Sequence, residues 1–232
     1  MSSDPNIAMI ASLLSEPSRA AILLALMDDR FYTAGELAKK GGVKPQTASY
    51  HLSKMVEANI ATVEKQGRHR YYRLSGHEVA KILESLLYLA PPVEIKSFNQ
   101  SVEDKAIRLA RTCYDHIAGN LGVKLTEAML EMEIIKIDHS EIKITEKGNK
   151  FFSDLQVDIT HIRKKRRSFC HQCLDWTERR FHLGGALGHA ILEKLLELGW
   201  IQRAEKTRAL KITPKGTKGF EEVFHIEFPL GN

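Results

Sequence analysis

One stretch of the chain, residues 33 to 74, restricts the fold more than any other. Thr33 to Lys40 has the composition of a short helix, and a Gly-Gly pair follows it. A second helix is expected to begin at Pro45, because the fixed φ of proline suits the first helical turn, where an amide would lack a partner anyway. The sequence therefore predicts two consecutive helices joined by a tight glycine turn.

The second helix is expected to have two chemically different faces. An apolar stripe at i, i+4, i+7 and i+8 predicts the side that packs on the core; it consists of Ala48, Leu52, Met55 and Val56. The remaining positions carry hydrogen-bonding side chains: Gln46, Thr47, Ser49, Tyr50, His51 and Lys54. This polar face is either a solvated helix surface or a surface that contacts a ligand.

An α-helix fits the major groove of B-DNA, where short polar side chains near its first turn reach base edges. Gln46 and Thr47 are the candidates for reading bases. Ser49, Tyr50 and Lys54 suit phosphate contacts, which fix register without supplying sequence information. His51 is compatible with either role.

A basic hairpin is predicted after the second helix. Ile60 to Glu64 and Tyr71 to Leu74 are two short runs of strand-forming residues. Between them lies a tip that contains Arg68, His69 and Arg70. Residues 39 to 73 contain eight Lys or Arg against two Glu, a charge of +6, whereas the whole chain is +5. Such local charge is typical of a surface that binds a polyanion, and the order of elements is that of a winged helix-turn-helix that binds double-stranded DNA.

The first ninety residues resemble the ArsR/SmtB-type winged-helix repressors. The resemblance is carried by four motifs: Glu16-Pro17-Ser18-Arg19 before an apolar helix, Glu36-Leu37-Ala38, Ser49-Tyr50-His51-Leu52, and Gly67-Arg68-His69-Arg70-Tyr71-Tyr72-Arg73-Leu74. It implies a dimeric repressor that leaves its operator when an inducer binds. Neither metal site known in that family can be transferred, because residues 33 to 40 contain no Cys or His and residues 78 to 90 contain no His or Asp.

Residues 78 to 90 are expected to form a dimer helix. Their apolar stripe is wide and is not needed for the core of a winged helix; it consists of Val79, Ile82, Leu83, Leu86, Leu87 and Ala90. Burial against a second copy would place two recognition helices about one DNA turn apart on a near-palindromic site. Packing of the stripe against the rest of the chain is the alternative.

The chain, 232 residues with 43% hydrophobic residues, is long enough for two domains. We expect a DNA-binding and dimerisation domain over 1–90, a linker over 91–99 that begins with Pro91-Pro92, and an effector or oligomerisation domain over 100–232. No apolar run is long enough to span a membrane and the N-terminus does not resemble a signal peptide, so we expect a cytoplasmic protein with reduced thiols.

The expected effector domain contains an internal repeat over 111–158 and 171–228. His116-Ile117-Ala118-Gly119-Asn120-Leu121-Gly122 recurs as His182-Leu183-Gly184-Gly185-Ala186-Leu187-Gly188, and Cys113-Tyr114-Asp115 recurs as Cys173-Leu174-Asp175. We interpret each copy as a helix, helix, β-ribbon unit that is winged-helix-like but has no basic recognition face. The fold class expected for the whole chain is therefore mainly α with short β-hairpin wings (α+β). The paired glycines are interpreted as helix ends or close backbone contacts, since no P-loop Lys-Ser/Thr follows them.

The candidate effector residues are the cysteines and histidines that the repeat makes equivalent, together with a CxxC cysteine: Cys113, His116, Cys170, Cys173 and His182. Three kinds of effector stay open. Thiol chemistry is favoured by the CxxC and by the basic run at 163–167, which could lower the pKa of Cys170. A zinc-like ion would suit the donor types, although the spacing lacks a second CxxC or a paired histidine, so no metal site or cofactor is assigned. A small organic inducer in a pocket lined by Tyr114, Trp176 or Trp200 is the third.

The function predicted from the sequence is that of a sequence-specific, homodimeric DNA-binding repressor. A redox or metal sensor that uses Cys113, Cys170 and Cys173 is the alternative form of this regulator. A cysteine-dependent enzyme fused to a winged helix is the remote alternative, because no triad, cofactor loop or carboxylate pair accompanies Cys173. We therefore assign no catalytic residue.

Overall fold

The computed structural model describes residues 4–139 and 141–228. The chain forms two compact units, Met1–Leu87 and Tyr88–Asn232, which are described separately below. Within the described residues no single helix is long and apolar enough to cross a membrane, although the first two helices, bent by 88° at their junction, have the length and composition when taken together.

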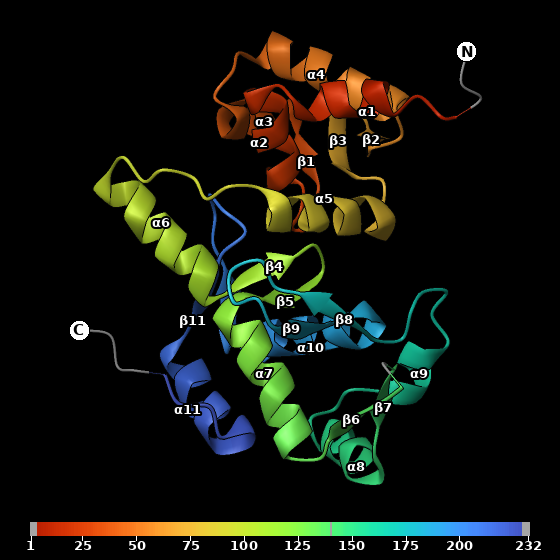
Figure 1. Cartoon of the computed structure of the whole chain (residues 1–232), viewed down its shortest axis with the longest axis vertical. Coiled ribbons are helices and arrows are strands. Elements are labelled where there is room, and N and C mark those ends of the chain that lie inside the picture. Colours follow the sequence, from red (N-terminus) through yellow and green to blue (C-terminus); the bar gives the residue numbers. More distant parts are fainter. Residues whose placement is uncertain (1–3, 140, 229–232) are drawn as a thin grey trace. The chain divides into compact units, whose positions relative to one another are not determined.

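The first unit is a small helical domain with one sheet (Figure 1). Its elements are α1 (Ile7–Leu14), α2 (Pro17–Ala25), β1 (Tyr32–Thr33), α3 (Ala34–Gly41), α4 (Pro45–Glu57), β2 (Ala61–Gln66), β3 (His69–Leu74) and α5 (His77–Leu89), whose last two residues belong to the second unit. The three strands form an antiparallel sheet in the order β1-β3-β2. This is the winged helix-turn-helix arrangement that the sequence predicts.

Local signals explain why α3 and α4 begin and end where they do. The Thr33 side chain accepts a hydrogen bond from the Glu36 amide, and Glu36 accepts one from the Thr33 amide, so both ends of a capping box are made. Gly42 ends α3 in the left-handed conformation, with φ of 64°. Pro45 then occupies the first turn of α4. The two helices are thereby fixed to each other by a short, defined turn.

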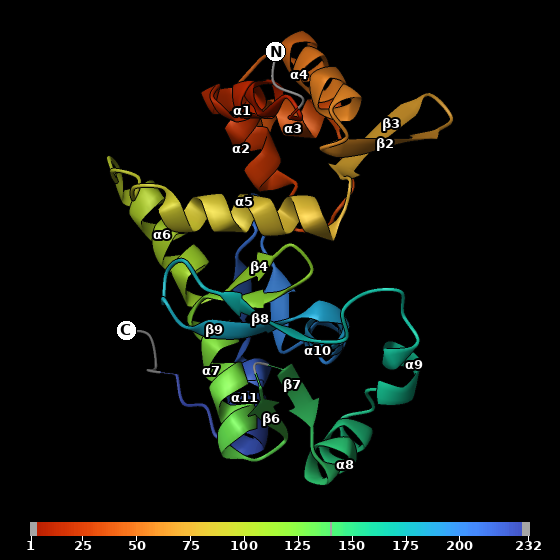
Figure 2. The same ribbon diagram turned by 45° about the vertical axis from the view of Figure 1, so that its right-hand side comes forward.

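The wing is longer than the sequence indicates. β2 and β3 pair from Ala61 with Leu74 to Gln66 with His69, which leaves a turn of only Gly67 and Arg68. Gly67 has a φ of 59°, which suits a tight hairpin turn. Figure 2 shows this hairpin extending away from the helices of its unit. The basic tip is therefore held by strand pairing rather than by a six-residue loop.

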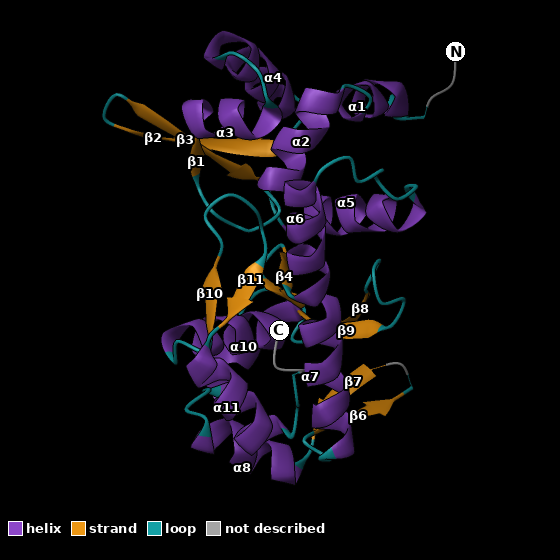
Figure 3. Cartoon of the chain, turned by 90° about the vertical axis from the view of Figure 1, so that its left-hand side faces the viewer, coloured by secondary structure: helices purple, strands orange, loops and turns teal. Residues whose placement is uncertain are grey.

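The second unit consists of short hairpins and helices (Figure 3). Its elements are α6 (Phe98–Leu109), β4 (Arg111–Cys113), β5 (His116–Ala118), α7 (Gly119–Glu131), β6 (Ile135–Asp138), β7 (Glu141–Ile144), α8 (Glu146–Asp154), α9 (Ile159–Arg163), β8 (His171–Leu174), β9 (Phe181–Gly184), α10 (Gly185–Glu197), β10 (Ile201–Arg203), β11 (Leu210–Ile212) and α11 (Pro214–Phe224).

The order hairpin, helix, hairpin, helix occurs twice in this unit. It runs from β4 to α8 and again from β8 to α11. The expected order of helix, helix, β-ribbon is wrong at its first element, because His116 and His182 lie on strands. Tyr114, with a φ of 59°, closes the first of these hairpins in a tight turn that the sequence pattern did not reveal.

The two copies interlock at their centre. Helix α7 packs on β9 of the second copy, and α10 packs on β5 of the first. Their buried side chains belong to one continuous apolar core, which includes Leu121, Met129, Leu187 and Leu195. Each copy therefore depends on the other to bury its helix.

Candidate functional site

The outer face of α4 carries most of the predicted DNA-contacting residues. Ala48, Leu52 and Met55 are fully buried against the core of the first unit. On the other side, four polar side chains are exposed: Gln46, Thr47, Ser49 and Tyr50. The structure thus presents hydrogen-bonding groups along the first two turns of α4, where a groove-binding helix reads bases.

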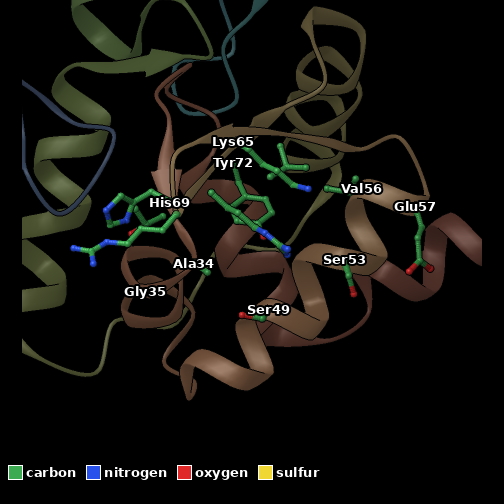
Figure 4. A pocket seen from close by; sticks show the side chains of 13 residues that line it. Ala34, Gly35, Ser49, Ser53, Val56, Glu57, Lys65, His69 and Tyr72 are labelled. Atoms are coloured by element: carbon green, nitrogen blue, oxygen red, sulfur yellow. The ribbon is translucent and has the colours of Figure 1, made fainter.

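A groove of about 590 Å³ lies between α4, the start of α3 and the wing. Figure 4 shows Ser49 and Ser53 of α4 along one side and Lys65 and His69 of the wing along the other. Arg68 and Arg70 also line it. Ser49 and Ser53 of α4 and the basic hairpin therefore border the same depression, as expected of a surface that holds a polyanionic backbone.

Lys54 lies on this surface but already has an anionic partner. Its ammonium is 2.8 Å from a Glu57 carboxylate oxygen, one helical turn away. The hydrogen bond to Glu57 raises the pKa of Lys54. Both side chains are substantially exposed, so the pair is weak and Lys54 can exchange Glu57 for a phosphate.

His51 is not part of the exposed face, which corrects the prediction of a DNA contact. His51 is only 6% exposed. Its Nε2 lies 3.0 Å from the Ser18 hydroxyl and 3.3 Å from a Glu16 carboxylate oxygen. Position 51 stands three residues after Ala48 and one before Leu52, so the helical period turns it toward the core. His51 fixes α4 against the start of α2.

The Glu16 carboxylate organises that junction. It accepts hydrogen bonds from the Ser18 hydroxyl and from the amides of Ser18 and Arg19. The Ser18 hydroxyl, followed by these amides, holds the pKa of Glu16 down at about 2. The Glu-Pro-Ser-Arg motif is thus a helix N-cap that also holds the recognition helix through His51.

Helix α5 leaves part of its apolar stripe exposed. Ile82 is 59% exposed, Leu86 is 42% exposed and Leu89 is 76% exposed, and these residues recur at i, i+4 and i+7. Ala80 and Leu83 are buried instead. One face of this helix therefore offers apolar surface to a partner.

In the second unit, four candidate effector residues converge. Cys113 pairs in register with His116 across β4 and β5, and Cys173 pairs with His182 across β8 and β9. One side-chain donor atom from each residue lies within 4.8 Å of the other three. Cys113 Sγ is 3.8 Å from Cys173 Sγ, and the two histidine Nε2 atoms are 3.2 Å apart. Equivalent residues of the two copies thus meet in pairs.

Two aspartates that were not predicted as site residues stand behind the histidines. Asp115 Oδ1 is 3.3 Å from Nδ1 of His116, and Asp175 Oδ2 is 3.4 Å from Nδ1 of His182. Each carboxylate also binds an arginine: Asp115 binds Arg167, and Asp175 binds the fully buried Arg111 at 2.9 Å. The recurring Cys-x-Asp of the two copies was the sequence signal for these aspartates, but the pattern alone assigned them no role.

The cluster is strongly polarised. Burial opposes the charged form of His116, but hydrogen bonds from its ring to Asp115 and Cys173 raise its pKa to about 9. Hydrogen bonds from Cys113, and then from the two histidines, lower the pKa of Cys173 to about 2. The group as a whole therefore favours a thiolate at Cys173.

Cys170 does not join this cluster. Its thiol donates to the Ile142 carbonyl oxygen at 3.0 Å. Burial raises the pKa of Cys170 to about 11 and outweighs the opposite effect of Arg163. The expectation that the basic run lowers the pKa of Cys170 is therefore wrong, because desolvation of the thiolate outweighs the stabilisation of its charge by nearby basic residues.

The three aromatic residues considered for an inducer pocket have structural contacts instead. Trp200 is buried and packs edge-on against Phe220, with ring centroids 5.3 Å apart. The guanidinium of Arg111 lies 4.6 Å from the ring centroid of Trp176. Tyr114 is buried in the β4–β5 turn. Their surroundings do not favour a common aromatic-lined pocket.

Comparison with known proteins places these features in a family. Residues 14–64 match the family described as a helix-turn-helix domain. An uncharacterised HTH-type transcriptional regulator, YdfF, of Bacillus subtilis (strain 168) is 48% identical over 224 residues, which cover 97% of this chain and 99% of that protein. The biofilm growth-associated repressor of Agrobacterium fabrum is 28% identical over 88 residues, which cover 37% of this chain and 74% of that protein.

Among solved structures, NolR from Sinorhizobium fredii is 27% identical and covers 40% of this chain and all of that chain, with a TM-score of 0.34. The similarity to YdfF extends over both units. With its helix-turn-helix match and a relative that is 48% identical over nearly the whole of both chains, the chain belongs to the helix-turn-helix transcriptional regulators.

Proposed function

We propose that this regulator is a homodimeric repressor that binds a near-palindromic operator through α4 and the wing. The observation that carries the proposal is the exposed polar face of α4 together with the groove that separates Ser49 and Ser53 of this helix from the basic hairpin. In this proposal Gln46 and Thr47 read base edges. Ser49, Tyr50, Lys54, Arg68, His69 and Arg70 contact the backbone.

The division of labour follows from side-chain length and position. Gln46 and Thr47 occupy the first turn of α4, which enters a major groove most deeply in helix-turn-helix docking. Arg68 and Arg70 lie at the end of a hairpin, beyond the helix surface, where a phosphate or a minor groove would lie. Base contacts would therefore give sequence preference and the wing would give affinity.

The proposed dimer rests on the exposed stripe of α5. Ile82, Leu86 and Leu89 form an apolar face on a helix that follows the wing directly. A twofold axis beside that helix would present two recognition helices to successive major-groove turns, which suits an inverted repeat. The name of the Agrobacterium relative, a repressor, supports repression as the outcome of binding.

The second unit is proposed to be the effector domain, built by duplication of one element with the order hairpin, helix, hairpin, helix. Two occurrences of the same element order, interlocked at α7 and α10, support duplication. In this proposal an effector bound by the second unit releases the operator, which the protein meets in the cytoplasm. Catalysis by Cys173 is disfavoured because Cys113, His116 and His182 around it are buried, which leaves a substrate little access.

The test is selection of bound sequences from random duplex DNA by the full reduced chain, together with sedimentation of the protein. We expect an enriched inverted repeat and a dimer. Leu86→Glu should give a monomer that binds the repeat weakly, whereas Lys81→Glu, an exposed change on another face of α5, should leave the dimer intact. Enrichment of no sequence, or a Leu86→Glu protein that is still dimeric, would overturn the corresponding part of the proposal.

A further inference from the structure

The strongest feature outside the DNA-binding surface is the cluster of Cys113, His116, Cys173 and His182. Neither the helix-turn-helix match nor the description of YdfF explains this cluster. We propose that these four residues bind one divalent ion of the zinc class in a tetrahedral site with two sulfur and two nitrogen ligands. The ion would connect the two copies of the duplicated element.

The distances between donor atoms agree with this geometry. Zinc binds thiolate sulfur at about 2.3 Å and imidazole nitrogen at about 2.0–2.1 Å, so a tetrahedral site requires sulfurs about 3.8 Å apart and nitrogens about 3.3 Å apart. The observed separations are 3.8 Å for the sulfurs and 3.2 Å for the nitrogens. All four donor atoms lie within 4.8 Å of one another, so small movements of the side chains would complete the tetrahedron.

The arrangement of the two imidazoles suits a cation. Nδ1 of His116 lies 3.3 Å from Asp115, and Nδ1 of His182 lies 3.4 Å from Asp175. The two Nε2 atoms are 3.2 Å apart, close enough for both to bind one ion. A carboxylate behind a ligating histidine is the usual support for such a bond.

The charges around the cluster also fit an ion of charge +2. Two thiolates would neutralise the ion itself. The carboxylates behind the histidines are neutralised separately, Asp115 by Arg167 and Asp175 by Arg111. Sulfur and imidazole donors together favour zinc over magnesium or calcium, which prefer oxygen.

The fold makes room for this site with two glycines. A Cβ at Gly188 would lie 3.1 Å from Cβ of His116 and 2.4 Å from the Leu183 carbonyl oxygen. A Cβ at Gly122 would lie 2.4 Å from the Ile117 carbonyl oxygen and 3.5 Å from Cβ of His182. Each helix therefore uses glycine where it passes the hairpin that carries the other copy's histidine, which explains the glycines that recur in the repeat.

A disulfide between Cys113 and Cys173 is the competing chemistry. The sulfurs are 3.8 Å apart, well beyond the bonded distance of about 2.05 Å. A disulfide would also leave the two facing Nε2 atoms without a cation. The metal accounts for all four residues, whereas the disulfide accounts for two.

Cobalt binding to the full-length reduced protein, stripped of metal by a chelator, tests the site. We expect one Co²⁺ per chain, with the visible bands of tetrahedral cobalt and a near-ultraviolet thiolate charge-transfer band, and displacement by Zn²⁺. Cys113→Ser and His182→Ala should abolish this spectrum. Cys170→Ser is the matched control and should retain it, since that thiol binds the Ile142 carbonyl instead. Asp115→Asn should weaken metal affinity about 10–100-fold.

Three results would overturn the proposal: a folded, reduced wild-type chain without the tetrahedral spectrum, loss of the spectrum in Cys170→Ser with retention in Cys113→Ser, or a Cys113–Cys173 disulfide in protein prepared with zinc present. If the variants do not fold, X-ray absorption of the wild-type zinc form decides, with two sulfurs at about 2.3 Å and two nitrogens at about 2.0–2.1 Å expected. Binding of duplex DNA, measured on the same samples, separates failure of this site from failure of the proposed operator function.

Discussion

In the first unit most of the residues predicted to contact DNA are exposed, whereas in the second unit three of the candidate effector residues, Cys113, His116 and His182, are buried. Gln46, Thr47 and Arg70 are exposed, so a large partner can contact them. His116 and His182 are buried on the interlocked hairpins, so a large partner cannot contact them directly. Substitution of an exposed residue should mainly change binding of the partner, whereas substitution of a buried residue should also change folding. The two units therefore respond differently to substitution, and four predictions test this.

Removal of metal is expected to have the largest effect, and to be confined to the second unit. An ion held at 1,000 times its dissociation constant stabilises the folded form by about 4 kcal/mol. A chelator should therefore lower the melting transition of the second unit and leave that of the first unchanged, as followed by calorimetry. Cys170→Ser should respond as the wild type does. A chelator that shifts only the melting transition of the first unit would contradict the assignment of the metal to the second unit.

Gln46→Ala is expected to relax base preference at one position of each half-site. The loss of one side chain that reads a base costs about 1–3 kcal/mol of discrimination at that position. Competition between operator duplexes that differ at single bases measures the effect. Gln202→Ala, an exposed glutamine of β10, is the control and should change nothing. A uniform loss of affinity for all sequences would show that Gln46 does not read a base.

His51→Ala and His69→Ala should separate packing from contact within the first unit. The buried His51 holds Ser18 at 3.0 Å, so its loss should cost about 1–2 kcal/mol of folding free energy. Loss of the exposed His69 side chain on the wing should cost almost no folding free energy. Denaturant unfolding gives both values. Equal stability of the two variants would contradict the structural role of His51.

Arg70→Ala should change DNA affinity the least, and by the same amount for every DNA sequence. Loss of one phosphate contact lowers the slope of log affinity against log salt by about 1, for every DNA sequence. Anisotropy titrations over a range of salt concentrations measure the slope. Arg166→Ala removes an exposed arginine of the second unit and serves as the control. An unchanged slope in Arg70→Ala would remove the wing from the interface.

The contrast between the units also explains what the sequence could predict. The helical stripe of α4 and the basic tip of the wing are local patterns, so neighbouring residues alone predict that Gln46, Thr47 and Arg70 are exposed, as the structure shows. His51 was misplaced because it lies at the edge of the buried stripe, where periodicity leaves its direction open. Only the contact with Ser18, 33 positions away, settles it.

The second unit was harder because its site joins residues far apart in the chain. Cys113 and Cys173 are 60 positions apart, and His116 and His182 are 66 apart. The repeat identified these residues as equivalent but could not show that equivalent positions meet. The sequence pattern predicts a helix where the structure has the hairpin from Cys113 to His116, because the tight turn at Tyr114 leaves no sequence signal comparable to Asn-Gly.

Amide hydrogen exchange of the full chain tests most directly whether DNA binding belongs to the first unit and metal binding to the second. Exchange is measured with and without the selected operator, and with and without a chelator. The account predicts two distinct footprints. Operator should slow exchange in residues 45–57 and 61–74, and chelation should speed exchange in residues 111–118 and 171–184. Operator protection confined to the second unit, or a chelator without effect on the two buried hairpins, would contradict it.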